Sequence, residues 1–250
     1  MLKNKVLENL GVSRDVAETA LEFTVKNVLC DYFDVHECDV DVDVRSKTAT
    51  LFFGIPQKME LEEAEAIDSN IYFCNSLPVT LDFASFPKSV VKDCKLFFPR
   101  MLDEIKALDA YKLWKSRVHK AVEGVIVDVA ENESWVEVDL SGQTGIMRKE
   151  EWIPKEVNRY RKGRVFFFYI LKATLKKSIV QVFLSRRSIN LPAALLEKRV
   201  PWIKFSCKKR IAGHKSWVHT SSVDQLQKKT LYDVQQELSG ERIELLHFPV

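Results

Sequence analysis

The sequence predicts a multidomain α+β protein with an N-terminal α+β domain, a small β-barrel and a C-terminal α+β domain. With 250 residues, the chain is longer than one average domain. Five closely spaced segments between residues 120 and 187 are rich in β-branched and aromatic residues, as strands are. Apolar residues at helical spacing occur on both sides of these segments. We therefore expect domains over residues 1–117, 118–188 and 189–250.

The central segments have the pattern of a closed five-stranded barrel. In residues 135–140 (WVEVDL), apolar side chains alternate at period two, so one strand face should point into a core. Gly145 lies early in the third segment, where a small barrel needs a backbone bend. Residues 149–157 lack alternation and fit a short helical connection. Five strands with a break after the third are typical of the OB-fold, which binds oligonucleotides. The expected strands are residues 121–130, 135–140, 143–148, 164–174 and 178–185.

The N-terminal domain is expected to begin with a helix and a hairpin. Ser13 is a good N-cap, and apolar spacing predicts a helix over residues 14–33. Residues 38–44 (CDVDVDV) alternate without interruption and pair, after a turn, with residues 49–54.

A short acidic helix and two short strands are expected next, over residues 57–70, 71–73 and 79–83. A second long helical pattern covers residues 89–119 and contains Pro99. Because proline removes a hydrogen bond and clashes with the preceding turn, we expect a kink or break near Phe98.

The C-terminal domain is expected to contain a helix, two strands, a helix and a strand. Pro192 suits the first turn of the first helix, and Pro201 ends it. Gly213 and His214 turn the strand pair, and Gly240 follows the second helix. The expected elements are residues 193–199, 203–212, 215–220, 223–238 and 242–247.

The net charge of +3 conceals a strong asymmetry. Residues 155–215 hold 17 Lys and Arg against two acidic residues, a net charge of +15. Residues 1–154 carry a net charge of −10, and the last 35 residues carry −2. A positive segment on an OB pattern favours binding to phosphates, whereas the acidic first part does not.

Composition also indicates the compartment. The five cysteines are scattered and odd in number, which matches neither a disulfide framework nor a zinc site, so we expect reduced, buried thiols. No apolar run approaches the roughly 20 residues that a membrane span needs. Glu8 lies where a signal peptide would be apolar. The expected location is the cytoplasm, with no membrane association.

The sequence predicts no enzyme activity and no cofactor. Nucleotide-binding, zinc-protease and serine-hydrolase motifs are absent, and the five histidines show no metal-ligand spacing. An alternative treats Asp39, Asp41 and Asp43 as a metal centre of an enzyme. On a strand, however, these side chains lie about 7 Å apart along one face. A solvated strand face is the preferred interpretation.

Several short motifs of the chain resemble those of known protein families. Gly124-Val125, WVEVDL, GIMR (residues 145–148), RKGRV (161–165) and FLSRR (183–187) look like an S1-type RNA-binding domain. EEWIPKEVNRYRKGRV (150–165) is similar to the NusA family of bacterial transcription elongation and termination factors. Residues 16–29 and 38–53 resemble the first helix and hairpin of that family, and LSGERIELL (238–246) resembles the end of its first KH domain. The resemblance implies a monomer that docks on RNA polymerase near the RNA exit channel and binds single-stranded nascent RNA.

The chain also departs from this family. A KH domain holds RNA with a Gly-x-x-Gly loop, because bare backbone must approach the phosphates. That loop should lie near residues 225–228, which are Gln, Leu, Gln and Lys. A second KH domain has no counterpart, and Pro99 departs from an uninterrupted connecting helix. We expect a degenerate KH-like scaffold that binds RNA more weakly and less selectively than the complete family pattern.

Candidate RNA-binding residues follow from position and charge. Trp135 stands where S1 domains carry a stacking aromatic residue, although packing at the barrel edge is an equal alternative. In the run 166–169, one alternating pair should enter the core and the other should be exposed or covered by a neighbouring domain. The cationic candidates are Arg148 at the end of the third strand, Lys176, Lys177, Arg186 and Arg187 beside the last strand, and the cluster Lys208, Lys209 and Arg210.

The leading hypothesis is a NusA-type factor that modulates pausing, termination and antitermination without catalysis, by binding RNA polymerase and nascent RNA. One alternative is a stand-alone S1-domain protein that binds RNA or assists translation. The sequence leaves open whether the chain is a specialised paralogue or the only factor of its kind in its lineage.

Overall fold

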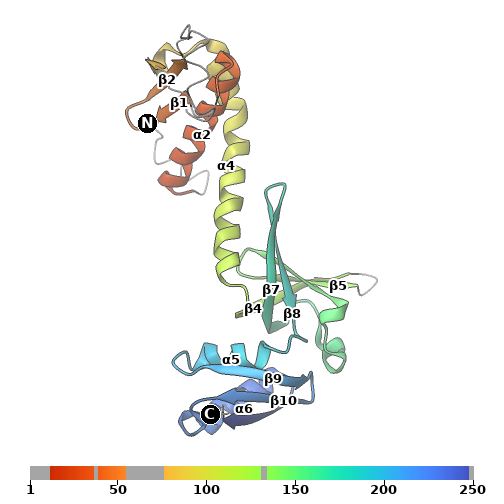
Figure 1. Cartoon of the computed structure of the whole chain (residues 1–250). Coiled ribbons are helices and arrows are strands. Elements are labelled where there is room, and N and C mark those ends of the chain that lie inside the picture. Colours follow the sequence, from red (N-terminus) through yellow and green to blue (C-terminus); the bar gives the residue numbers. More distant parts are fainter. Residues whose placement is uncertain (1–11, 37–38, 55–75, 131–133, 248–250) are drawn as a thin grey trace, which may run out of the picture. The chain divides into compact units, whose positions relative to one another are not determined.

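The computed structural model describes residues 12–36, 39–54, 76–130 and 134–247 (Figure 1). The chain divides into two compact units, Met1–Lys106 and Ala107–Val250. The boundary falls within one long helix, α4 (Lys88–Ser116). The predicted barrel and C-terminal domain both belong to the second unit.

In the first unit, helix α2 (Arg14–Phe33) has the predicted bounds. The side chain of Ser13 accepts a hydrogen bond from the backbone N–H of Val16, which confirms it as the N-cap. At the other end, Asp34 adopts a left-handed conformation with φ of 52°. The helix buries one face against the sheet of this unit, through Val25, Val28 and Leu29.

That sheet has three antiparallel strands in the order β1 (Val40–Asp43), β2 (Thr48–Gly54) and β3 (Ser76–Asp82). The hairpin of β1 and β2 confirms the alternating pattern, since Val40 and Val42 are buried and Asp41 is exposed. Strand β3 starts earlier than predicted and ends where Asp82 caps the short helix η2 (Phe83–Ser85). Cys38 and the elements predicted for residues 57–70 and 71–73 lie outside the described residues.

Of the kink or break predicted near Phe98, the break does not occur, because helix α4 continues through Pro99. A proline removes only its own N–H from the ladder, and here regular helix extends for several turns on both sides. The ion pair of Arg100 and Glu104, with Nε and Oε1 3.0 Å apart, links successive turns just after the proline.

The second unit contains the predicted barrel, in which five strands close in the order β4-β5-β6-β8-β7. Only β6 and β8 run parallel. This OB-like barrel confirms the sequence pattern. The strands are β4 (Ala121–Val129), β5 (Trp135–Asp139), β6 (Thr144–Arg148), β7 (Val165–Lys176) and β8 (Ile179–Ser185).

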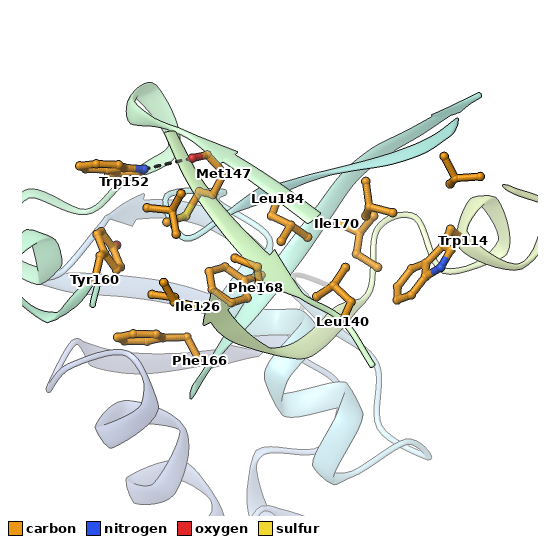
Figure 2. Close-up of a cluster of buried hydrophobic side chains, with 14 of the residues drawn as sticks. Trp114, Ile126, Leu140, Met147, Trp152, Tyr160, Phe166, Phe168, Ile170 and Leu184 are labelled. Atoms are coloured by element: carbon orange, nitrogen blue, oxygen red, sulfur yellow. Dashed lines mark hydrogen bonds between the residues drawn. The ribbon is translucent and has the colours of Figure 1, made fainter. Parts of the chain in front are cut away.

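Aliphatic and aromatic side chains fill the barrel (Figure 2). The predicted helical connection is present as two short helices, η3 (Lys149–Glu151) and η4 (Pro154–Arg159). Beside them Trp152 enters the core, and its indole Nε1 donates a 3.2 Å hydrogen bond to the carbonyl of Met147. The core members include Ile126, Leu140, Met147, Trp152, Phe166, Phe168, Ile170 and Leu184.

The C-terminal part of the unit is a three-stranded sheet with two helices. Strand β10 is central, antiparallel to β9 and parallel to β11. Helix α6 begins later than predicted, because Leu226 is extended and separates it from the short helix η5 (Val223–Gln225). The other elements are α5 (Leu191–Arg199), β9 (Phe205–Ile211), β10 (Lys215–Thr220), α6 (Lys228–Glu237) and β11 (Arg242–His247).

Among the helices that the structure describes, none is long and apolar enough to span a lipid bilayer.

Among the glycines of the barrel, Gly124 of β4 has the least room for a side chain. A Cβ atom built there would lie 2.4 Å from Cγ1 of Val138 and 2.7 Å from Cδ2 of Leu140. Both neighbours are buried and cannot move aside freely. Glycine at this position therefore allows β4 and β5 to pack closely.

We predict that Gly124→Ala lowers the free energy of unfolding by about 1–3 kcal/mol through overpacking. Urea unfolding should show a lower midpoint at an unchanged slope. Val125→Ala, on the same strand but 38% exposed, is the control and should have a smaller effect. A Gly124→Ala protein as stable as the wild type would contradict this packing argument.

Candidate nucleic-acid interface

Trp135 and Arg148 lie side by side on the outside of the barrel. They are direct partners in the register of β5 and β6. The next pair, Val136 and Met147, is fully buried, so alternation directs Trp135 and Arg148 away from the core. Trp135 is half-buried and Arg148 is exposed. The structure thus brings together two of the predicted RNA-binding residues.

A second aromatic ring continues this surface. Phe183 of β8 is half-buried and lies beside Ile146 of β6 in the parallel register. The guanidinium carbon of Arg148 is 5.4 Å from the centroid of the Phe183 ring, and the ammonium of Lys172 is 4.7 Å from it. Both are cation–π distances. We call Trp135, Ile146, Arg148, Lys172 and Phe183 the outer barrel face.

Sequence reasoning missed Phe183 and Lys172. The sequence could have indicated Phe183, because the apolar residues on either side, Val182 and Leu184, point into the core and Phe183 therefore points outward. Nothing in the sequence indicated Lys172, because a register irregularity between Ile170 and Lys172 places this lysine opposite Phe183.

The outer barrel face has the chemistry of a single-strand binding surface. Each base presents a flat π-face, and stacking on an aromatic side chain is worth about 1–3 kcal/mol per base. Arg148 and Lys172 place positive charge beside the Phe183 ring, where the phosphates next to a stacked base would lie. Glu137, opposite Ile146 in the middle of β5, also lies on this side and is half-buried, so it disfavours phosphates next to it.

Other predicted cations remain exposed but lie away from this pair of rings. Lys176 and Lys177 form the exposed end of the β7–β8 hairpin, where Lys177 and Ser178 have positive φ, as two-residue hairpin turns require. Arg187 is exposed, and its Nη1 lies 3.4 Å from the carbonyl oxygen of Glu150. Lys208 and Lys209 are exposed on β9, in a different sheet from the barrel.

The prediction that Arg186 binds RNA is wrong, because this side chain is completely buried. An arginine has five N–H donors, and each donor of Arg186 has an acceptor inside the protein. Nε and Nη2 bind the Glu156 carboxylate at 2.9 and 2.6 Å, and Nη1 binds Glu237 Oε1 at 3.0 Å. The two remaining donors bind the carbonyls of Phe167 and Glu237.

Arg210 is a second wrong prediction of the same kind, since its side chain is 1% exposed. It pairs with the buried carboxylate of Glu241, with Nε 2.9 Å from Oε1 and Nη2 2.9 Å from Oε2. Its Nη1 donates to the carbonyls of Arg186 and Ser188. Glu241 is further held by the backbone N–H of Gly213 and the hydroxyl of Ser216. Neither arginine can reach a phosphate without unfolding its surroundings.

The ion pair also determines how Glu156 titrates. Burial alone would raise the pKa of this carboxyl, but the hydrogen bonds and charge of Arg186, with Ser239 and Tyr160, keep the pKa below its ordinary value. Glu156 is therefore ionised at neutral pH although it is fully buried.

The run of residues 166–169 divides as alternation predicted. Phe166 and Phe168 are in the barrel core, whereas Tyr169 is buried in the core of the C-terminal sheet and Phe167 packs against it. The outward pair is thus covered by the neighbouring domain. The ammonium of Lys198 on α5 lies 4.5 Å from the centroid of the Phe167 ring.

The alternative metal centre on β1 gains no support from the described residues. Asp43 is already engaged in its turn: its Oδ1 accepts hydrogen bonds from the N–H groups of Arg45 and Ser46 at 2.8 and 3.1 Å. The backbone hydrogen bond from Ser46 is the main reason why the pKa of Asp43 is lowered. Within the described part of the chain, no group of three or more His, Cys, Asp or Glu side chains is arranged to hold a metal ion.

We predict that Arg186→Met destabilises the second unit by about 3–5 kcal/mol, because it leaves Glu156 buried and unpaired. Adding Glu156→Gln should recover part of that loss, which a double-mutant cycle measures. The control Arg187→Met changes an exposed neighbour and should have little effect. If Arg186→Met and Arg187→Met were equally stable, the stabilising role of the ion pair between Arg186 and Glu156 would be contradicted.

The same pair predicts a dependence of stability on pH. Because the folded pKa of Glu156 lies below its ordinary value of 4.5, the contribution of the pair is complete above about pH 4.5 and disappears as pH falls through the lower, folded pKa. Urea unfolding across this acidic range should therefore show a steeper loss for the wild type than for Glu156→Gln/Arg186→Met. If the stability of the wild type and of the double variant changed identically with pH, the lowered pKa of Glu156 would be contradicted.

No family model matches the chain, and a search of curated proteins found no match. A function is therefore inferred from the chain's own residues.

Proposed function

We propose that the chain binds single-stranded RNA on the outer barrel face and acts, without catalysis, as a NusA-type transcription elongation factor. The observation that carries the RNA-binding part is the pairing of two rings, Trp135 and Phe183, with two cations, Arg148 and Lys172, on one side of an OB-like barrel. OB-type barrels use such surfaces for oligonucleotides.

The positive charge of the second unit supports this proposal. Residues 155–215 carry a net charge of +15. Arg186 and Arg210 are neutralised internally by Glu156, Glu237 and Glu241. Most of the other basic residues of this segment are exposed and contribute to a field that attracts a polyanion.

The polymerase-binding part rests on the resemblance of the N-terminal segments and on the order of elements. The capped helix α2 and the acidic hairpin β1–β2 are consistent with that resemblance. The order α5, β9, β10, α6, β11 supports a KH-like module that lacks the Gly-x-x-Gly loop. In this proposal the first unit docks on RNA polymerase, and the second contacts the emerging transcript to modulate pausing, termination or antitermination.

We predict that Phe183→Leu weakens the binding of single-stranded RNA by about 5- to 150-fold, because one stacking platform is lost. Fluorescence anisotropy of a labelled oligouridine with the full chain measures this. Val165→Ala is the control, since Val165 is exposed on β7 and lies outside the outer barrel face. Unchanged affinity of Phe183→Leu would refute the proposed site.

Salt dependence provides a second readout in the same assay. Arg148→Gln should reduce the slope of log K against log salt by about 0.7 if Arg148 contacts one phosphate. A wild-type affinity that does not change between low and physiological salt would contradict phosphate-driven binding.

Affinity purification of the full chain distinguishes the two cytoplasmic roles. A NusA-type factor should recover RNA polymerase, and a nascent transcript on the polymerase should increase the yield. Recovery of RNA without polymerase would instead indicate the stand-alone S1-type RNA-binding protein.

A further inference from the structure

The C-terminal sheet has one open face that the proposed function does not use. Residues that point toward helices α5 and α6, such as Ser216, Val218 and Ile243, are buried. Their neighbours along the strands, Trp217 and Arg242, therefore lie on the opposite face. On this opposite face Arg242 of β11 and Lys209 of β9 are exposed, and Trp217 is half-buried.

Trp217 is at the centre of this face and lies between two lysines. The ammonium of Lys215, two residues earlier on β10, is 4.6 Å from the centroid of the Trp217 ring, and the ammonium of Lys209 on β9 is 5.2 Å from it. Trp217 itself is half-buried, so part of the indole is accessible. We call Lys209, Lys215 and Trp217 the open sheet face.

A β-bulge produces this arrangement. The register of β9 and β10 shifts between Trp217 and Val218, which pair with Lys209 and Cys207 respectively. Lys208 is the extra residue, and the shift brings Lys209 directly opposite Trp217. Cys207 keeps its position in the core on the other side. The strand pair thus accommodates one more residue and presents two adjacent lysines.

The charge around Trp217 is predominantly positive. Arg242 and Lys208 are exposed beside Lys209 and Lys215. One acid, Glu244, pairs with the ammonium of Lys215, and this hydrogen bond lowers the pKa of Glu244. Two lysines thus lie over the ring, and two further cations, Lys208 and Arg242, are exposed next to them in the sheet. In contrast to Arg186 and Arg210, none of these cations belongs to the buried ion-pair networks.

We propose that the open sheet face is a second site for single-stranded RNA, where one base stacks on Trp217 and Lys209 and Lys215 bind the adjacent phosphates. The ligand class rests on the proposed function, but the surface and residues are different. An incoming base would take one face of the indole, and the flexible stem of the displaced lysine lets its ammonium follow the phosphate. An acidic peptide would need the lysines but not the ring, so the ring favours RNA.

Two sites on one unit should make binding depend on the length of the RNA. An RNA that reaches both surfaces gains from effective concentration, whereas a short one binds only one of them at a time. In the KH-like module, the open sheet face thus supplies the phosphate contacts that a Gly-x-x-Gly loop would otherwise make.

The test uses the full chain and fluorescence anisotropy with oligouridines of about 6 and about 30 nucleotides. Trp217→Leu and Lys209→Gln should each weaken binding of the long RNA, with at least about a fivefold loss for Trp217→Leu. Trp217→Phe keeps a stacking ring and should restore most of the affinity. Trp202→Leu is the matched control, since Trp202 is 75% exposed and lies outside the open sheet face. Circular dichroism verifies that each variant is folded.

Wild-type affinity of a folded Trp217→Leu protein for the long RNA would overturn the inference. So would a loss confined to the lysine variants, because that pattern indicates a purely ionic surface such as an acidic peptide would use. Phe183→Leu separates the two proposals: if it binds normally while Trp217→Leu does not, the outer barrel face is refuted and the open sheet face stands.

Discussion

The buried guanidinium of Arg186 joins the barrel to helix α6 of the C-terminal part of the second unit. It extends from the end of β8 and binds Glu156 in the connection between β6 and β7, the carbonyl of Phe167 in β7, and Glu237 in α6. Because each donor has an acceptor, removal of any partner leaves a polar group buried without compensation. Arg210 adds to this junction by donating to the carbonyls of Arg186 and Ser188. The barrel and the C-terminal sheet therefore pack as one body.

This junction determines which positive charges are available to a ligand. Adjacent arginines have opposite roles: Arg186 is buried within the protein, whereas Arg187 is exposed. The outer barrel face and the open sheet face have the same local construction, an aromatic ring with two cations within 6 Å, at Phe183 and at Trp217. In the proposed function, net charge attracts a polyanion to the unit, and these rings provide the surfaces on which its bases stack.

Regular patterns made much of the fold predictable, and contacts over long sequence separations explain the failures. The barrel strands followed from period-two alternation, and α2 followed from Ser13 and its apolar spacing. Burial of Arg186 was not predictable, because its partners Glu156 and Glu237 are 30 and 51 residues away in the sequence. Lys172 and Lys209 reach their rings through register shifts that no local pattern signals. Pro99 does not break helix α4, because a proline removes only one backbone donor and a long helix tolerates that loss.

Cross-linking of single-stranded RNA containing 4-thiouridine to the intact chain, with mass spectrometric mapping of the modified peptides, tests the central claim most directly. If the outer barrel face binds RNA, cross-links will occur in peptides that contain Trp135 or Phe183, and competitor RNA will suppress them. Cross-links confined to the first unit, or absent from all barrel peptides, would contradict the claim.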